Sequence, residues 1–308
     1  MTVNFRRWRC GAKVVLLGVG LCAFTGCSTL RVERWQPAFQ GVDITRGEAR
    51  EGKPRLQQVR AVRIDLHDPD IAFLASPSNG DAPLETTSET TSAFLLRHHL
   101  QVAVNANFFE PCCTPGDKDL LGLAVSRGDV VSPAVAAGLG SKALILTHEN
   151  RARIVATVDE AAVVGAWTAV AGSEIVLARG QKTEWPATDF NRLTHPRTAV
   201  GVSRDGRYLI VVVIDGRQPG YSMGATMDEV AAWLRRLGAY DGLNLDGGGS
   251  ATLVRAEGDK AIVLNRPSGA GRPAGDGSEN QASVRTLRSV GNSLGVFAKP
   301  PPATNAGR

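Results

Sequence analysis

The residues best suited to chemistry stand at positions 246 to 250, where an aspartate precedes three glycines and a serine. Three glycines in a row allow a ligand to approach the backbone closely, and free N–H groups in such a turn suit an anion such as phosphate. The residues are Asp246, Gly247, Gly248, Gly249 and Ser250. No Lys-Ser or Lys-Thr pair follows, so this is not a nucleotide-binding P-loop. A tight turn is the alternative, but a turn rarely needs three glycines.

A second carboxylate and two arginines accompany this segment. Asp215 and Arg217 directly follow a strongly apolar run, and Arg197 stands just before another one. A guanidinium can hold a phosphate through two parallel hydrogen bonds. The alternatives are a plain turn at 215–217 and a surface arginine at the start of a strand. Two carboxylates beside an anion-binding surface favour a hydrolytic site.

Two asparagines follow the apolar run 101–104. Asn105 and Asn107 precede the rings of Phe108 and Phe109. Asparagine amides can hydrogen-bond to sugar hydroxyls, and aromatic rings can lie against the face of a sugar. The alternative is a turn with core aromatics. We interpret the two asparagines as candidate substrate-binding residues.

The elements that position these residues can be read from residues 207 to 250. The β-branched run 208–214 predicts a strand covered on both faces. Thr226 and Glu229 form a capping box for a helix that Gly238 can end, and 242–245 predicts a second strand. Strand, helix and strand of this size predict a βαβ crossover with parallel strands. Asp215 and Asp246 would then lie at the same sheet edge, where ligands of parallel sheets bind.

The remaining pattern predicts an α+β fold with mixed β-sheets, the parallel βαβ unit at about 207–250, and helices around a surface cavity. One domain over 59–298 is the simplest organisation, because neither an internal repeat nor a clear linker is visible. Residues 28–58 are mixed and polar and are expected to be a tether. Residues 299–308 have three prolines directly after Lys299 and are expected to be disordered.

The first 26 residues have the pattern of an export signal. Four basic residues precede the apolar run 14–24, which is too short to span a bilayer and suits a signal peptide. Small residues then precede Cys27, as at a bacterial lipidation site. The sequence therefore predicts a lipoprotein held in the cell envelope by its lipid alone, on the periplasmic side of the outer membrane because Ser28 follows the cysteine. An ordinary secretory signal and an N-terminal core helix are the alternatives.

The net charge limits the classes of binding partner that the sequence favours. Removing the four positive charges of this signal lowers the formal net charge from +5 to +1, which leaves no general electrostatic case for nucleic-acid binding.

Beyond Cys27 only Cys112 and Cys113 remain. Adjacent cysteines cannot join distant segments in a normal intrachain bridge, and they are a weak metal signal. They could form a vicinal disulfide, pair with another chain, or have only an incidental role in a loop.

Read together, seven segments resemble the phosphodiester glycosidase family, to which the mammalian uncovering enzyme, N-acetylglucosamine-1-phosphodiester α-N-acetylglucosaminidase, and many bacterial exopolysaccharide-related proteins belong. They occur in the family's order and span roughly residues 60–298. The most specific are HPRTAVG, DGR and LNLDGGGSATLV. The segments are 104–109, 122–131, 171–181, 195–217, 223–254, 264–268 and 290–297.

This resemblance implies cleavage of a sugar–O–phosphate link at the anomeric carbon, on a GlcNAc-α-1-phosphodiester-like envelope glycan. It also implies a cavity lined by Asn105, Asn107, Arg197, Asp215, Arg217, Asp246, Gly247, Gly248 and Ser250. We expect Asp246 or Asp215 to activate water or stabilise the transition state, with Asp246 favoured. No cofactor or metal is required. A phosphodiesterase that cuts the other P–O bond and a non-catalytic glycan-binding lipoprotein are the competing functions.

Overall fold

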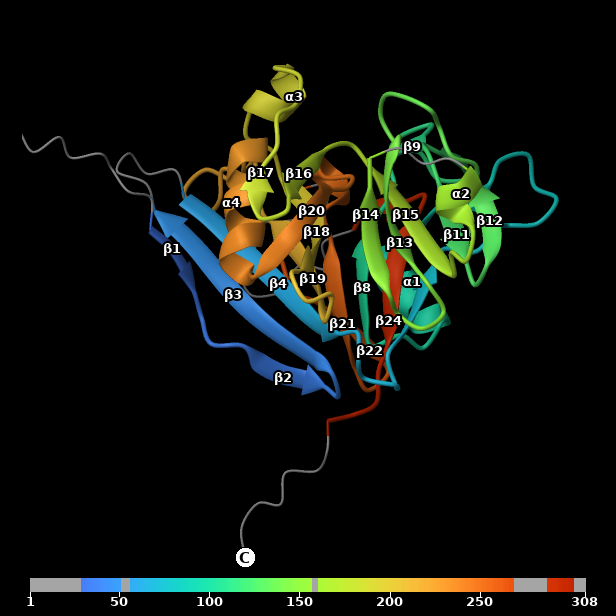
Figure 1. Ribbon diagram of the computed structural model, residues 1–308, viewed down its shortest axis with the longest axis horizontal. Coiled ribbons are helices and arrows are strands. Elements are labelled where there is room, and N and C mark those ends of the chain that lie inside the picture. The colour runs from blue at the N-terminus through green and yellow to red at the C-terminus, as the bar shows by residue number, and fades with distance from the viewer. Residues whose placement is uncertain (1–28, 51–55, 157–159, 269–286, 302–308) are drawn as a thin grey trace, which may run out of the picture.

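The computed structural model describes residues 29–50, 56–156, 160–268 and 287–301 (Figure 1). Strands dominate these residues, and the helices are few and mostly short. The helices are α1 (Thr91–Arg97), α2 (Glu160–Val163), α3 (Asp189–Arg192), α4 (Met227–Leu237) and the 3-10 turn η1 (Gly248–Ser250). The expected export signal and the lipidation site at Cys27 lie outside the described residues, as does most of the expected tail.

The largest sheet has nine strands. Its order is β1-β3-β4-β19-β18-β20-β16-β17, with β2 paired to β3, and each pair is antiparallel. The strands are β1 (Thr29–Val32), β2 (Gln36–Phe39), β3 (Val42–Arg50), β4 (Leu56–Asp65), β16 (Ile175–Ala178), β17 (Gln181–Lys182), β18 (Arg197–Ser203), β19 (Tyr208–Ile214) and β20 (Ala239–Asn244). Residues 29–50, expected as part of a tether, therefore extend this sheet, because β3 pairs with β4 and both β1 and β2 pair with β3.

Two five-stranded sheets and two small ones complete the fold, again with antiparallel pairs. One order is β12-β11-β15-β13-β14, the second is β22-β21-β8-β24-β5, and the small sheets are β6-β10-β9 and β23-β7. The strands of the first are β11 (Ala124–Ser126), β12 (Asp129–Ser132), β13 (Lys142–Leu146), β14 (Ala152–Val155) and β15 (Thr168–Gly172). Those of the others are β5 (Ala72–Ala75), β6 (Thr86–Thr87), β7 (Glu89–Thr90), β8 (Val102–Asn105), β9 (Phe109–Glu110), β10 (Asp117–Leu120), β21 (Leu253–Glu257), β22 (Lys260–Val263), β23 (Ser289–Val290) and β24 (Ser293–Phe297).

This architecture corrects the expected α+β class with mixed sheets and a parallel βαβ unit. The fold is a curled antiparallel half-barrel, mostly strand. Helix α4 does connect β19 to β20, but β18 lies between these strands and pairs antiparallel with both. A crossover helix fixes only the common direction of the strands that it joins. The insertion of 197–203 between them depends on pairings that the 207–250 pattern does not contain.

Local signals around α4 are confirmed. Thr226 and Glu229 form the complete capping box, and Gly238 ends the helix with a φ of 105°. The helix lies against the large sheet (Figure 1), where Trp233 is fully buried and donates through Nε1 to Gln57 Oε1 at 2.7 Å. Helix α4 thereby covers one face of the strands that end at the candidate site.

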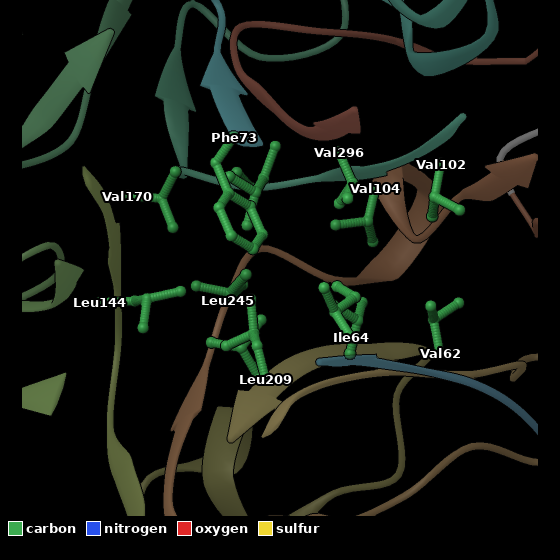
Figure 2. Close-up of a cluster of buried hydrophobic side chains, with 14 of the residues drawn as sticks. Val62, Ile64, Phe73, Val102, Val104, Leu144, Val170, Leu209, Leu245 and Val296 are labelled. Carbon is green, nitrogen blue, oxygen red and sulfur yellow. The ribbon is translucent and has the colours of Figure 1, made fainter. Parts of the chain in front are cut away.

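The main core lies where the sheets face one another. Figure 2 shows Val62, Ile64 and Leu209 of the large sheet opposite Val104 and Val296 of the β8 sheet, with Leu144 and Val170 of the β13 sheet closing one side. All these side chains are buried. Strand β4 is covered on a different face in each half, because Val59 and Ala61 pack in the cluster with Trp233 of α4, whereas Val62 and Ile64 lie in the main core. Among the described helices, none is long and apolar enough to cross a membrane.

Candidate active site

Strand register gathers the predicted charged residues at one edge of the large sheet. Arg197 at the start of β18 pairs with Ile214 at the end of β19, and Ala199 pairs with Asn244 at the end of β20. Asp215 and Asp246 follow those two ends. Because β19 and β20 run in the same direction on either side of β18, both carboxylates leave the sheet beside Arg197.

Asp246 is half-buried beside the glycine turn η1. Its backbone N–H donates to Ala106 O at 3.0 Å, and its carboxylate accepts from the Ser250 hydroxyl and the Gly247 N–H. Burial raises the pKa of Asp246 to about 7, while these hydrogen bonds and the positive charge of Arg288 act in the opposite direction. A carboxyl with such a pKa exists in both protonation states near neutral pH, which suits proton transfer.

A cavity of about 590 Å³ opens over Asp246 and Ser250. Its other walls come from the β8–β9 segment, the β9–β10 hairpin and single leucines. The size is that of a small-molecule site. The charged lining consists of Asp246, Arg288, Glu110 and Asp119, and the apolar lining includes Phe108, Pro111, Cys112, Leu121 and Leu139. We refer to this space as the Asp246 cavity.

Two guanidinium groups flank the glycine turn. A Cβ at Gly249 would lie 2.4 Å from Arg288 Cζ, so only glycine lets this guanidinium rest against the turn. A Cβ at Gly248 would lie 3.4 Å from Arg217 Nη2, and Gly248 has a φ of +59°. Gly248 and Gly249 therefore permit close contact with two cations, whereas a Cβ at Gly247 would lie 2.6 Å from the Pro196 carbonyl oxygen. The N–H of Gly248 is used within the fold, since it donates to Pro196 O at 2.9 Å.

Asn105 is fully buried and fixes the backbone at the site. Its Nδ2 donates to Asp246 O at 2.6 Å, and its Oδ1 accepts from Thr198 Oγ1 and from Thr252 N. This side chain therefore joins β8, β18 and the segment that follows the glycine turn. The geometry gives Asn105 a positioning role rather than contact with a sugar.

Asn107 is also engaged by the protein. Its Nδ2 donates to the carbonyls of Gly122 and Leu123, and its Oδ1 accepts from Ala171 N and Asn292 Nδ2, each within 3.2 Å. Each polar atom of the Asn107 amide thus takes part in two hydrogen bonds. Through them Asn107 joins the β8–β9 segment to the residues just before β11, to β15 and to Asn292.

Arg197 lies buried beneath the site. Its Nε donates to Ala225 O at 2.9 Å, its Nη2 donates to the carbonyls of Phe190 and Leu193, and its guanidinium lies 4.6 Å from the Phe190 ring centroid. Desolvation, aided by the nearby Arg217, lowers the pKa of Arg197 to about 10. One donor, Nη1, is buried without a partner among the described residues. Arg197 chiefly braces the segment before β18 and keeps one N–H available.

Arg217 is exposed and has a φ of 58°, an uncommon conformation for a residue with a side chain. Its Nη2 lies 3.3 Å from Nδ1 of His195. Desolvation lowers the pKa of His195, and the charges of Arg197 and Arg217 lower it further. Neutral His195 can therefore accept a hydrogen bond from Arg217 and orient the guanidinium beside the glycine turn.

Asp215 is buried and tied into the fold. Its carboxylate accepts from Asn265 Nδ2, Arg266 N and Tyr221 Oη, at 2.9, 2.9 and 3.1 Å. Desolvation raises the pKa of Asp215, and the three hydrogen bonds oppose this shift. Asp215 is not part of the lining of the Asp246 cavity. The arrangement favours a structural role for Asp215 in holding the 217–222 turn that carries Arg217.

Sequence reasoning missed Arg288 and the wall formed by the β9–β10 hairpin. Arg288 follows a long Gly- and Pro-rich stretch without a local pattern, so only its contact with Gly249 reveals it. Cys112 and Cys113 form a vicinal disulfide in the hairpin, and Cys112 lines the Asp246 cavity. Within the described ranges, no group of three or more His, Cys, Asp or Glu side chains is placed to hold a metal ion.

Comparisons with known proteins identify the family and the fold. A family model described as phosphodiester glycosidase matches residues 98–297. No curated protein matches the chain. A solved structure with similar architecture is the catalytic domain of zebrafish N-acetylglucosamine-1-phosphodiester alpha-N-acetylglucosaminidase, auto-inhibited by its pro-peptide. It is 19% identical, with a TM-score of 0.61, over 88% of this chain and 89% of that chain.

Two bacterial structures share the fold as well. A hypothetical protein from Synechocystis is 16% identical, with a TM-score of 0.59, over 88% of this chain and 68% of that chain. A putative exported protein from Burkholderia pseudomallei is 18% identical, with a TM-score of 0.53, over 82% and 76%. At these identities the similarity concerns the fold alone.

Proposed function

The chain belongs to the phosphodiester glycosidase family, and from this premise we propose that it hydrolyses sugar-1-phosphodiesters at the anomeric carbon. The substrate class is a GlcNAc-α-1-phosphodiester-like unit of an exopolysaccharide or another envelope glycan. The observation that carries the proposal is that Asp246 and Arg288 line one cavity and lie close enough for the charge of Arg288 to act on the Asp246 carboxyl.

The phosphate is held by the two guanidinium groups that flank the glycine turn. Arg288 lines the Asp246 cavity, and Arg217 lies on the other side of Gly248. A guanidinium presents paired N–H donors to phosphate oxygens and stabilises the charge that develops as the phosphate leaves. Arg197 contributes from beneath, through its position and its one unpaired N–H.

Asp246 acts on the attacking water. The ionised carboxylate accepts a proton from water as the water oxygen bonds to the anomeric carbon. The bond between that carbon and the phosphate oxygen breaks, and its electron pair leaves with the phosphomonoester. Glycosidases usually protonate the leaving oxygen with a second carboxyl. A phosphate monoester is already a good leaving group, so protonation of the leaving oxygen by a second carboxyl is less necessary here.

The remaining walls fit a sugar. Phe108, Pro111 and Cys112 add apolar surface to the lining that contains the charged residues. A pyranose has an apolar C–H face and a polar hydroxyl rim, and it can lie between two such surfaces. Asn105 and Asn107 support this pocket by fixing the backbone around it.

The cellular setting is also part of the proposal. The signal pattern of residues 1–26 and lipidation at Cys27 would hold the protein at the periplasmic side of the outer membrane, in reach of envelope glycans. A near-neutral mature chain carries no general attraction to nucleic acid. The lipid anchor is then the only membrane attachment, and no cofactor is needed for the step described.

The test is product analysis on the purified chain. We would incubate it with GlcNAc-α-1-phospho-methyl-mannoside and with a panel of other sugar-1-phosphodiesters, and identify the products by mass spectrometry. A free reducing sugar together with a phosphomonoester is the expected result. Release of a sugar-1-phosphate would instead mean that the P–O bond on the far side of the phosphate is cleaved, which contradicts the proposal.

Two variants make this test specific. Asp246→Asn keeps the size of the side chain and removes the base, so turnover should fall by roughly 100- to 1,000-fold. Asp228→Asn changes an exposed carboxylate on α4 and serves as the matched control, with activity equal to the unmodified chain. Equal activity of the Asp246→Asn variant would contradict the assignment of Asp246.

A further inference from the structure

A second cavity, of about 640 Å³, lies away from the Asp246 cavity and has no role in the proposed reaction. It is built from the β4–β5 loop, the β11–β12 turn, the β13–β14 turn and the residue before β15. Its characteristic side chains are Trp167, His148, Asn150, Asp68, Arg127 and Phe297. We call it the Trp167 groove.

The groove and the Asp246 cavity lie at opposite ends of one sheet. Leu121 lines the Asp246 cavity before β11, and Arg127 lines the groove after it. In the same way, Leu139 precedes β13 and His148 follows it. Strands of three and five residues separate the two sites by roughly 10 to 17 Å. A ligand in the groove therefore leaves the Asp246 cavity free.

The indole of Trp167 is held in place and remains accessible. Trp167 N donates to Leu146 O at 2.8 Å, and its own carbonyl accepts from Gly128 N at 2.9 Å. The His148 ring stands edge-on to the indole at 4.6 Å, and a Cβ at Gly128 would lie 3.6 Å from it. The side chain is only half-buried. Within the described residues no hydrogen bond of its indole N–H is found.

Polar groups are fixed around this ring. Asn150 Nδ2 donates to Ile71 O at 2.6 Å and ties two of the loops together. Asp68 accepts from Asp70 N at 3.0 Å, and Glu149 accepts from Thr147 Oγ1 at 2.9 Å. These carboxylates have remaining lone pairs that can accept from hydroxyls. The groove thus offers a rigid aromatic surface with acceptors on its rim.

The charges indicate the class of ligand. The groove is lined by two carboxylates, Asp68 and Glu149, together with Arg127 and the rings of His67 and His148, and Glu149 also pairs with Arg151 at 3.6 Å. The carboxylates offer acceptors to the hydroxyl groups of a ligand. An accessible indole with carboxylate and amide acceptors suits a neutral, polyhydroxylated ring, whose C–H face packs on the aromatic surface while its hydroxyls bond to the rim.

We propose that the Trp167 groove is a carbohydrate-binding site for a neutral sugar unit of a glycan chain, separate from the Asp246 cavity. Its function is to retain a polymer on the protein surface. A chain bound there raises the local concentration of its other units at the Asp246 cavity. Binding in the groove does not depend on hydrolysis, so it can be measured whether or not the proposed catalytic function holds.

Isothermal titration calorimetry on the purified chain tests the proposal with chitotetraose, cellotetraose and maltotetraose as probes. We expect at least one neutral tetrasaccharide to bind, with an affinity reduced about tenfold or more by Trp167→Ala and largely kept by Trp167→Phe. Trp185→Ala removes another half-buried tryptophan and is the matched control, with unchanged affinity. Asp246→Asn should also bind as the unmodified chain does.

Three results would overturn the proposal. One is the absence of binding to all three tetrasaccharides by the folded chain. Another is binding of choline alone, which would mark the groove as a cation site of the aromatic type. The third is unchanged affinity of the Trp167→Ala variant, provided that its circular dichroism spectrum matches that of the unmodified chain and so shows that the variant is folded. If that variant does not fold, His148→Ala at an exposed side chain replaces it, and unchanged affinity there has the same meaning.

Discussion

The side-chain amide of Asn105 donates to the backbone carbonyl of Asp246 across 2.6 Å. Through this bond a buried residue of β8 fixes the strand end that carries the proposed base. The same side chain accepts from Thr198 Oγ1 at 2.8 Å and from Thr252 N at 3.1 Å. One asparagine therefore links three segments that are distant in the sequence, and the position of the Asp246 carboxylate depends on it.

Replacement of Asn105 by aspartate should reduce both stability and turnover. The variant keeps the two acceptor bonds but places a carboxylate oxygen against the Asp246 carbonyl. Loss of one buried donor costs about 1 to 3 kcal/mol, more when a charge is buried. We expect a lower Tm by thermal denaturation. We also expect kcat to fall while KM changes little, because substrate-binding groups stay in place. An unchanged Tm and kcat would contradict the positioning role.

Activity should rise with pH through a limb near 7. Burial raises the pKa of Asp246 to about 7, and the ionised form is the one that accepts the proton of water. A profile of kcat/KM between pH 5 and 9 measures this limb. A profile that falls through the same range would mean that the protonated form of Asp246 is required, which contradicts its role as a base.

Stability should show the opposite dependence on pH. From about pH 4 to 7 the folded chain holds the Asp246 proton, which the unfolded chain has already released at its ordinary pKa of 3.8. This contribution to stability is therefore present at low pH and is lost as pH rises through about 7. The Asp246→Asn variant lacks this pH-dependent contribution. The Tm of the variant should therefore rise relative to the Tm of the unmodified chain as the pH is raised from 5 to 8. A constant Tm difference would contradict the raised pKa.

Arg288 and Gly249 should act as one unit on phosphate binding. Arg288→Ala removes the cation from the cavity and should lower kcat/KM by roughly 100-fold, with Arg288→Lys intermediate. Gly249→Ala places a Cβ where the guanidinium lies and should have a similar effect. Because both changes disrupt the same contact, the double variant should be no worse than either single one. Fully additive losses in kcat/KM would mean that the two residues act independently, which contradicts this prediction.

Arg217→Ala should weaken substrate binding without a change in stability. Its guanidinium is exposed and touches His195 at 3.3 Å, so little of the fold depends on it. We expect KM to rise by about tenfold and Tm to stay within the measurement error. The control is Arg204→Ala, at another exposed arginine, in the turn after β18. Equal KM values for the two variants would remove Arg217 from the proposed phosphate site.

Much of the local structure could be predicted from the sequence, because its signals are local. The capping box at Thr226, the left-handed Gly238 and the buried strand 208–214 each depend on a few neighbouring residues. The segment 246–250 could be singled out for the same reason. The family resemblance is confirmed by the match over 98–297.

The pairing of distant segments could not be predicted in this way. The run 197–203 reads as a strand, but nothing in it shows that it inserts between β19 and β20 and makes the sheet antiparallel. Arg288 has no local pattern, and its role appears only when β23 brings it against Gly249. The hydrogen-bond partners of Asn107 could not be predicted from the sequence either, because Gly122, Ala171 and Asn292 lie far from it along the chain.

The measurement that most directly tests the central claim is hydrolysis of a GlcNAc-α-1-phosphodiester in water labelled with the heavy isotope of oxygen. Attack of water at the anomeric carbon places the label in the released sugar and leaves the phosphomonoester unlabelled. We predict this distribution, together with its loss in the Asp246→Asn variant and its retention in Asp228→Asn. Label in the phosphate product, or equal turnover by Asp246→Asn, would contradict glycosidic cleavage by an Asp246-activated water.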